Sequence, residues 1–214
     1  MAPVLSDTLP SWPADSAVVV YPGERWPLYM SVKTNMLYDV LTVPNAGVEF
    51  YLKKGWSIAG EWQVAWWSRN AKHRYWRFAG GSLAVRRWLG KVADGKPLTG
   101  HHVGVYGQAA TYDVEWGDRG YMGGRPGGHG CDKINFAVGV EYGYSLPIRR
   151  RLNLDFTLGV GYWGGTYYKY TPQDGHYVWQ GTYKRRWFGP TNVGVNLVWL
   201  LGHGNENAGK GGIR

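Results

Sequence analysis

Histidine and acidic side chains are the residues of this 214-residue chain that could catalyse hydrolysis or acyl transfer. A site that cleaves a lipid or a peptide needs a nucleophile or an activated water beside a general base. The residues that could meet in this way lie in predicted loops and are His73, Asp118, His129 and Asp132. Because nothing in their spacing forces them together, we predict no catalytic residue, and an enzyme acting on lipid or envelope substrates is the alternative interpretation.

Metal and cofactor sites are not indicated either. The six histidines show no HExxH pattern, and the single cysteine, Cys131, forms no Cys/His ligand spacing and allows no internal disulfide. The glycine-dense stretch 117–131 lacks both the following Lys-Ser/Thr and the strand-to-helix context of a phosphate-binding loop. We therefore expect no metal and no cofactor.

Six charged residues have a different setting, because each stands singly among glycine, alanine and serine in a segment of alternating polarity. They are Lys33, Glu49, Glu61, Arg86, Glu141 and Asp155. A face exposed to water would carry many more charges, whereas small residues with a few ions suit the crowded interior of a narrow β-barrel. Buried ions of opposite sign must pair, since a lone one costs several kcal/mol. We predict that these residues form a polar network inside a barrel.

The elements that would position this network are strands. Residues 28–201 alternate between apolar and small or polar side chains, most clearly over 56–66 and 152–162. The 33 glycines and 16 tyrosines disfavour helix, and no apolar run approaches the length of a membrane-spanning helix. We predict an all-β fold, namely a closed antiparallel up-and-down transmembrane β-barrel of about eight strands whose interior is filled by side chains.

The connections between the predicted strands differ in length at the two ends of the barrel. Short turns at one end are expected at 53–55, 90–100 and 147–151. Loops at the other end are expected at 38–46, 68–74, 117–135 and 164–191. The two longest connections share one end, which is typical of outer-membrane barrels with short periplasmic turns.

The predicted barrel spans residues 28–202. A proline-rich lead-in, placed in the periplasm, precedes it over 1–27, and a polar tail follows over 203–214. The first residues have neither a basic region nor a long apolar core, so an outer-membrane location requires that a signal peptide was removed or that the native chain begins at another residue.

Aromatic residues indicate where the barrel would meet its surroundings. Tryptophans near predicted strand ends are expected at the membrane interface, and these are Trp56, Trp66, Trp88 and Trp199. The last predicted loop is rich in Tyr, Trp and Arg, the residue types of protein and glycan contact surfaces. Its candidate contact residues are Tyr177, Trp179, Arg185, Arg186 and Trp187. The alternative is a loop that folds over the barrel mouth and is held by its own aromatic residues.

The net charge of +9 does not by itself indicate a nucleic-acid partner, because the charges are scattered and no nucleic-acid-binding motif appears. We predict outer-membrane lipid as the main partner and no nucleic acid. A soluble ligand-binding barrel is a third interpretation, since its strands alternate as well.

Several segments, in order, resemble the Bacteroidota family known as domain of unknown function 3575. They are Lys33–Asp39, Pro44–Glu49, Ala65–Ser68, His73–Arg77, Leu98–His102, Gly139–Pro147, Asp174–Trp179 and Trp187–Thr191. The resemblance implies an outer-membrane barrel of unassigned activity, encoded near genes for fimbria-like surface proteins, and it offers no catalytic residues. The stretch Asn192-x-Gly194-x-x-Leu197-x-Trp199 also resembles the terminal assembly signal of outer-membrane barrels.

The sequence as a whole favours an outer-membrane β-barrel with a structural or surface-interaction role. An envelope or fimbrial protein is the expected protein partner, with an accessory role in fimbria-like surface assembly as its specific form.

Overall fold

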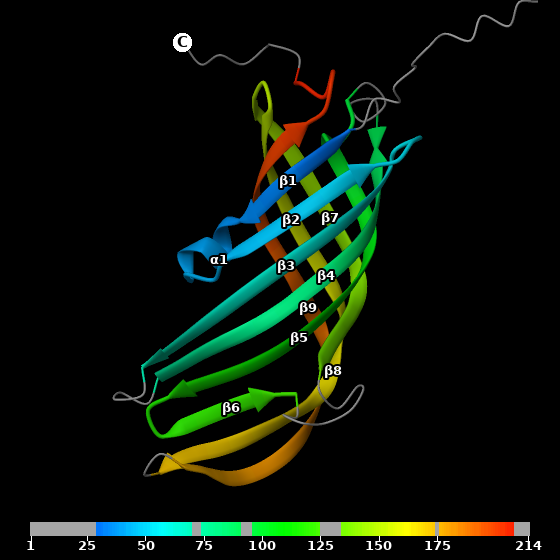
Figure 1. The fold of residues 1–214 in the computed structure, drawn as a ribbon. Coiled ribbons are helices and arrows are strands. Elements are labelled where there is room, and N and C mark those ends of the chain that lie inside the picture. The colour runs from blue at the N-terminus through cyan, green and yellow to red at the C-terminus, as the bar shows by residue number, and fades with distance from the viewer. Residues whose placement is uncertain (1–28, 70–73, 91–95, 125–133, 174–175, 208–214) are drawn as a thin grey trace, which may run out of the picture.

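The computed structural model describes residues 29–69, 74–90, 96–124, 134–173 and 176–207. These residues form antiparallel strands and one short helix (Figure 1), in the order β1 (Met30–Asn35), α1 (Met36–Val40), β2 (Asn45–Tyr51), β3 (Trp56–Arg69), β4 (Arg74–Leu89), β5 (Gly100–Trp116), β6 (Arg119–Gly123), β7 (Asn135–Arg149), β8 (Leu152–Gln173) and β9 (His176–Leu201). Over the described part of the chain, the length and hydropathy of the helix fall short of what a membrane crossing requires.

The strands form one nine-stranded sheet whose hydrogen bonds close a ring through eight strands. Each strand from β1 to β5 pairs with the next along the chain. The ring is closed by the pairing of β1 with β9, in which Val32 lies opposite Trp199. The expected all-β antiparallel architecture is confirmed. The strand count differs from the expected one because β6 and β7 share the position between β5 and β8, each pairing with both neighbours at a different height.

The strands are strongly staggered. When the register is followed from Val32 through each neighbouring strand in turn, it returns to β9 at Phe188, eleven residues from Trp199, which pairs with Val32 directly. A closed sheet with such a stagger must have tilted strands. At the end of the ring near α1, β3, β4, β5, β8 and β9 therefore run well past β1 and β2, as Figure 1 shows. We call the end of the ring that carries α1 the far end, and the opposite end of the ring the near end.

Glycines on the inner face make room for rings. A Cβ atom at Gly143 would lie 2.4 Å from Nε2 of His102, and one at Gly159 would lie 2.7 Å from the Tyr106 ring. His102 and Tyr106 are themselves buried, at 0% and 4% exposure. The glycines of β7 and β8 thus leave the space inside the ring that the large side chains of β5 occupy.

The near end is filled by side chains and by the residues after β9. Leu98 packs with Trp88, Val198 and Leu200 in a buried apolar cluster. Asn207 donates its backbone N–H to the carbonyl of Arg150 and its side-chain Nδ2 to Oδ1 of Asn153, both at 2.7 Å.

Glu206, the neighbour of Asn207, fixes the same segment from outside the ring. It accepts hydrogen bonds from Arg151 and Arg150, and these bonds hold the pKa of its carboxyl below the usual range. The beginning of the predicted polar tail, residues 203–207, therefore folds against this end of the ring.

Several predicted loops are wrong in part. The loop at 38–46 contains most of helix α1, and the one at 117–135 contains β6. The long loop at 164–191 is mostly strand, because β8 and β9 continue as a paired hairpin to Gln173 and His176. The lead-in at 1–27 lies outside the described residues.

Replacing Gly161 by alanine should destabilise the ring, because the new Cβ would lie 2.2 Å from the backbone carbonyl oxygen of Val138. Overpacking of this kind costs about 1–3 kcal/mol. Gly107→Ala is the matched control, since the nearest atom to its Cβ would be 4.0 Å away. Urea unfolding of protein refolded in detergent should show the loss for Gly161→Ala alone, and equal stability of the two variants would contradict this account.

Candidate functional site

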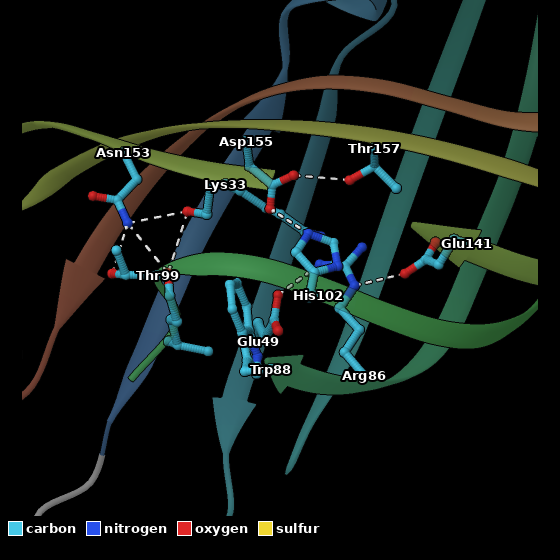
Figure 2. A network of polar contacts seen from close by, with 12 residues as sticks. Lys33, Glu49, Arg86, Trp88, Thr99, His102, Glu141, Asn153, Asp155 and Thr157 are labelled. Atoms are coloured by element: carbon cyan, nitrogen blue, oxygen red, sulfur yellow. Dashed lines mark hydrogen bonds and ion pairs between the residues drawn. The ribbon is translucent and has the colours of Figure 1, made fainter. Parts of the chain in front are cut away.

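The centre of the interior is Arg86 of β4, whose side chain is 1% exposed. Its Nη1 lies 2.7 Å from Oε2 of Glu49, and its Nε lies 2.6 Å from Oε1 of Glu141. Figure 2 shows these groups converging from separate strands, with Glu49 on β2 and Glu141 on β7. One guanidinium therefore connects three strands across the ring through charge-assisted hydrogen bonds, which are stronger than neutral ones.

Further contacts satisfy the remaining oxygens of both carboxylates. Ser57 donates to Glu49 at 2.6 Å, and the indole Nε1 of Trp88 donates to Ser57 at 2.8 Å. Asn192 donates to the second oxygen of Glu141 at 2.9 Å.

A β-bulge in β9 explains how Asn192 reaches this point. Gly159 pairs with Asn192 and the next residue of β8 pairs with Pro190, so Thr191 is an extra residue. The carbonyl of Thr191 accepts a hydrogen bond from Gln108 at 2.7 Å, and its hydroxyl contacts that of Tyr106. The bulge directs two successive polar residues inward.

Lys33 and Glu61 form a second ion pair on β1 and β3, and Glu61 also lies 3.8 Å from Nη2 of Arg86. Asp155 is held separately, because its Oδ2 lies 3.3 Å from Nε2 of His102 and its Oδ1 accepts from Thr157 at 2.8 Å. The structure thus joins five of the six predicted interior residues by ion pairs, and the sixth, Asp155, pairs with a histidine that the prediction did not include.

His102 lies on the inner face of β5 together with Gly104 and Tyr106. The alternation of side chains along this segment therefore already predicts that His102 points inward. The neighbouring His101 points outward and contacts the Tyr142 hydroxyl at 2.7 Å, as expected of adjacent residues on a strand.

These paired, buried groups stabilise the ring and offer no free nucleophile. Within the described ranges, no cluster of three or more His, Cys, Asp or Glu side chains could hold a metal ion. Of the residues considered for catalysis, Asp118 lies in the turn between β5 and β6, whereas His73, His129 and Asp132 lie outside the described residues.

Three of the four predicted interfacial tryptophans point outward. Trp56, Trp66 and Trp199 are 47–65% exposed, with Arg87 over the Trp56 ring and Arg77 over the Trp66 ring. The prediction for Trp88 is wrong, because this side chain is 3% exposed and packs on the His102 ring inside. Trp88 is two residues from Arg86 on β4, so the side chains of both residues lie on the inner face of this strand.

The inner surface at the far end carries a second assembly, which we call the cation–aromatic wall. It consists of Tyr112, Tyr121, Trp163, Tyr167, Lys169, Tyr183 and Arg185 from β5, β6, β8 and β9. Along β8, the wall residues continue the inward alternation of Asp155 and Thr157. The guanidinium of Arg185 lies 4.4 Å from the Trp163 ring centre, and Nζ of Lys169 lies 4.7 Å from that of Tyr183.

The predicted contact residues of the last loop divide between the two faces of the hairpin. Arg185 belongs to the wall, and Trp187 lies on the same face opposite Trp163. Tyr177 and Trp179 instead pack on the rings of Tyr170 and Tyr168. Arg186, which pairs with Gly164, follows Arg185 directly and therefore points to the opposite face of the hairpin. The five residues therefore do not form one surface. The predicted contact residues do not include Tyr167 and Lys169, because the prediction treats 164–191 as a loop.

Replacing Arg86 by methionine should cost about 3–5 kcal/mol of stability, because two buried carboxylates lose their partner. Arg87→Met, on the same strand but over the outer Trp56 ring, is the matched control and should change little. Adding Glu49→Gln and Glu141→Gln to Arg86→Met should recover part of the loss. Equal unfolding midpoints for the Arg86 and Arg87 variants would contradict a stabilising ionic centre.

Comparison with known protein families gives a match over most of the chain. The family model described as "Protein of unknown function (DUF3575)" matches residues 17–201, a range that includes all nine strands and the end of the stretch predicted as a lead-in. No curated protein matches the chain, and no solved structure does. The match covers most of the sequence, and the chain belongs to the DUF3575 family.

Proposed function

We propose that this protein is a β-barrel of the outer membrane with a structural or surface-interaction role, and that it forms no open pore. The observation that carries the proposal is the polarity of the two faces of the ring. The charged groups around Arg86 lie inside the ring and are paired, whereas large apolar side chains lie outside and are exposed.

The exposed apolar side chains surround the ring. Every ring position carries some of them, including Val32, Phe50, Trp62, Leu83, Val105, Val140, Leu158 and Val193, each at least 39% exposed. Soluble monomers rarely expose a continuous apolar surface of this extent, and such surfaces mark membrane or protein contacts. Acyl chains would solvate the belt, and closure leaves no unpaired strand edge there.

The filled interior argues against transport of a solute. The Arg86 network spans the ring, and the Leu98 cluster with Asn207 occupies the near end. Small barrels whose interior is packed with side chains have no channel. Such an interior agrees with the role of an anchored scaffold or of a surface that binds a partner.

The unequal ends suit one orientation. Both ends of the ring-forming chain, Met30 and Leu201, lie opposite each other at the near end, whereas the strands extend well past β1 and β2 at the far end. Outer-membrane barrels place such ends in the periplasm and their longer extensions outside the cell. The far end would then present its extended strands to the surroundings, where an envelope or fimbrial protein is the proposed partner.

Cell fractionation followed by gel electrophoresis tests the proposal. The protein should appear in the detergent-extracted outer-membrane fraction and migrate differently with and without boiling, because a closed barrel resists the detergent until heated. Recovery in a soluble fraction, with the same migration in both samples, would overturn it.

An arginine in the middle of the belt provides a sharper prediction. Val140→Arg should lower stability in lipid bilayers by about 2–4 kcal/mol, the cost of a cation on the lipid face at the membrane midplane. Val178→Arg, near the tip of the β8–β9 hairpin, makes the same change at a side chain that is 39% exposed. Folding titrations in bilayers should show the loss for Val140→Arg only, and similar values for both variants would count against a lipid-facing belt.

A further inference from the structure

We infer that the cation–aromatic wall is a binding site for an acidic glycan, a sugar chain that carries carboxylates or phosphates. The inference goes beyond the proposed membrane role and rests on the geometry of the wall. The first observation is that, over the described ranges, the cations of the wall have no acidic partner. Lys169 and Arg185 form no ion pair with any carboxylate of the described residues and instead lie against aromatic rings.

This setting differs from that of the cations inside the ring, where Arg86 and Lys33 each face a carboxylate. A cation held over a ring keeps its charge and can still accept an anion on its free side. Two such cations on neighbouring strands form a positive surface whose missing counter-charge an acidic ligand would supply.

The second observation is that aromatic side chains alternate with the cations and remain partly exposed. Along β9, Trp187, Arg185 and Tyr183 follow one another at every second residue, about 6.6 Å apart. Trp187 is 50% exposed and Tyr183 is 43% exposed. On the adjacent strands, Tyr121 pairs with Lys169 and is 39% exposed.

The rings are also fixed before any ligand arrives. Tyr167 and Tyr183 stack with ring centres 5.4 Å apart, and Tyr112 lies directly over Gly123, where a Cβ atom would come within 2.1 Å of the ring. A rigid aromatic surface loses little conformational entropy on binding.

Flat rings interspersed with a few cations fit a glycan better than the other acidic polymers. The negative face of an aromatic ring attracts the polarised C–H groups of a sugar face. A nucleic acid carries a phosphate on every nucleotide, and its affinity depends on many cations. The wall offers two stacked cations among five rings, which suits an acidic group only on every few units of a chain.

Binding is tested with the full chain in detergent micelles and oligogalacturonate as the probe, by titration calorimetry and tryptophan fluorescence. Its methyl ester has the same sugar units without charge, so it should bind at least about tenfold more weakly. The double variant Lys169→Gln/Arg185→Gln should lose a similar factor for the acidic form. Arg87→Gln is the matched control, because Arg87 also lies over a tryptophan ring but on the outer face of the near end.

Absence of saturable binding, equal binding of the ester, or an equal loss in Arg87→Gln would overturn the inference. Tighter binding of a single-stranded oligonucleotide or of a polyglutamate peptide would also overturn it, in favour of that partner. Because micelles replace the membrane, none of these results bears on the outer-membrane location, which the fractionation experiment decides separately.

Discussion

The ion pairs of Arg86 impose the constraint on which the remaining structure depends. A guanidinium that is 1% exposed cannot remain charged without partners, and its two closest carboxylates come from β2 and β7, neither of which is a neighbour of β4 in the ring. The network can therefore form only when the sheet has curled far enough for its two halves to face each other. Backbone pairing of β1 with β9 and side-chain pairing across the interior support the same closed geometry.

Once the ions occupy the interior, the large apolar residues have to lie outside. Glycines on the inner faces of β7 and β8 admit the rings of His102 and Tyr106, and the bulge at Thr191 brings Asn192 to Glu141. This is the reverse of a soluble protein, in which the interior is apolar and the surface carries the charges. The stagger of the strands then extends one part of the ring past β1 and β2, and that extension presents the cation–aromatic wall.

Much of the ring could be predicted from alternation alone. A charge such as Glu61 or Arg86, standing among small residues at every second position, has to share their face. The same rule applied strictly would have placed Trp88 and His102 inside. The prediction for Trp88 rests on its position near a strand end, where tryptophan is common, although its spacing of two residues from Arg86 is the stronger evidence.

Other features depend on contacts between strands far apart in sequence. The bulge at Thr191 is invisible in the sequence, because it is defined by the register of β9 against β8. The sequence predicts a loop over 164–191, rich in Tyr, Trp and Arg, where the structure has a paired hairpin. Those side chains are paired there in stacked rings and cation–π contacts, such as Arg185 with Trp163 and Tyr167, which hold the strands together without an apolar core.

The most direct test of this inside-out arrangement is site-directed spin labelling of the protein in lipid bilayers. Labels at Leu83, Val105 and Leu158 should collide readily with oxygen, which concentrates in the acyl region, and rarely with a water-soluble nickel complex. Labels at Ser82 and Thr157, one residue away on the inner face, should be sheltered from both reagents. If the labels on the outer face prove accessible to the nickel complex, the belt contacts water and the account is wrong.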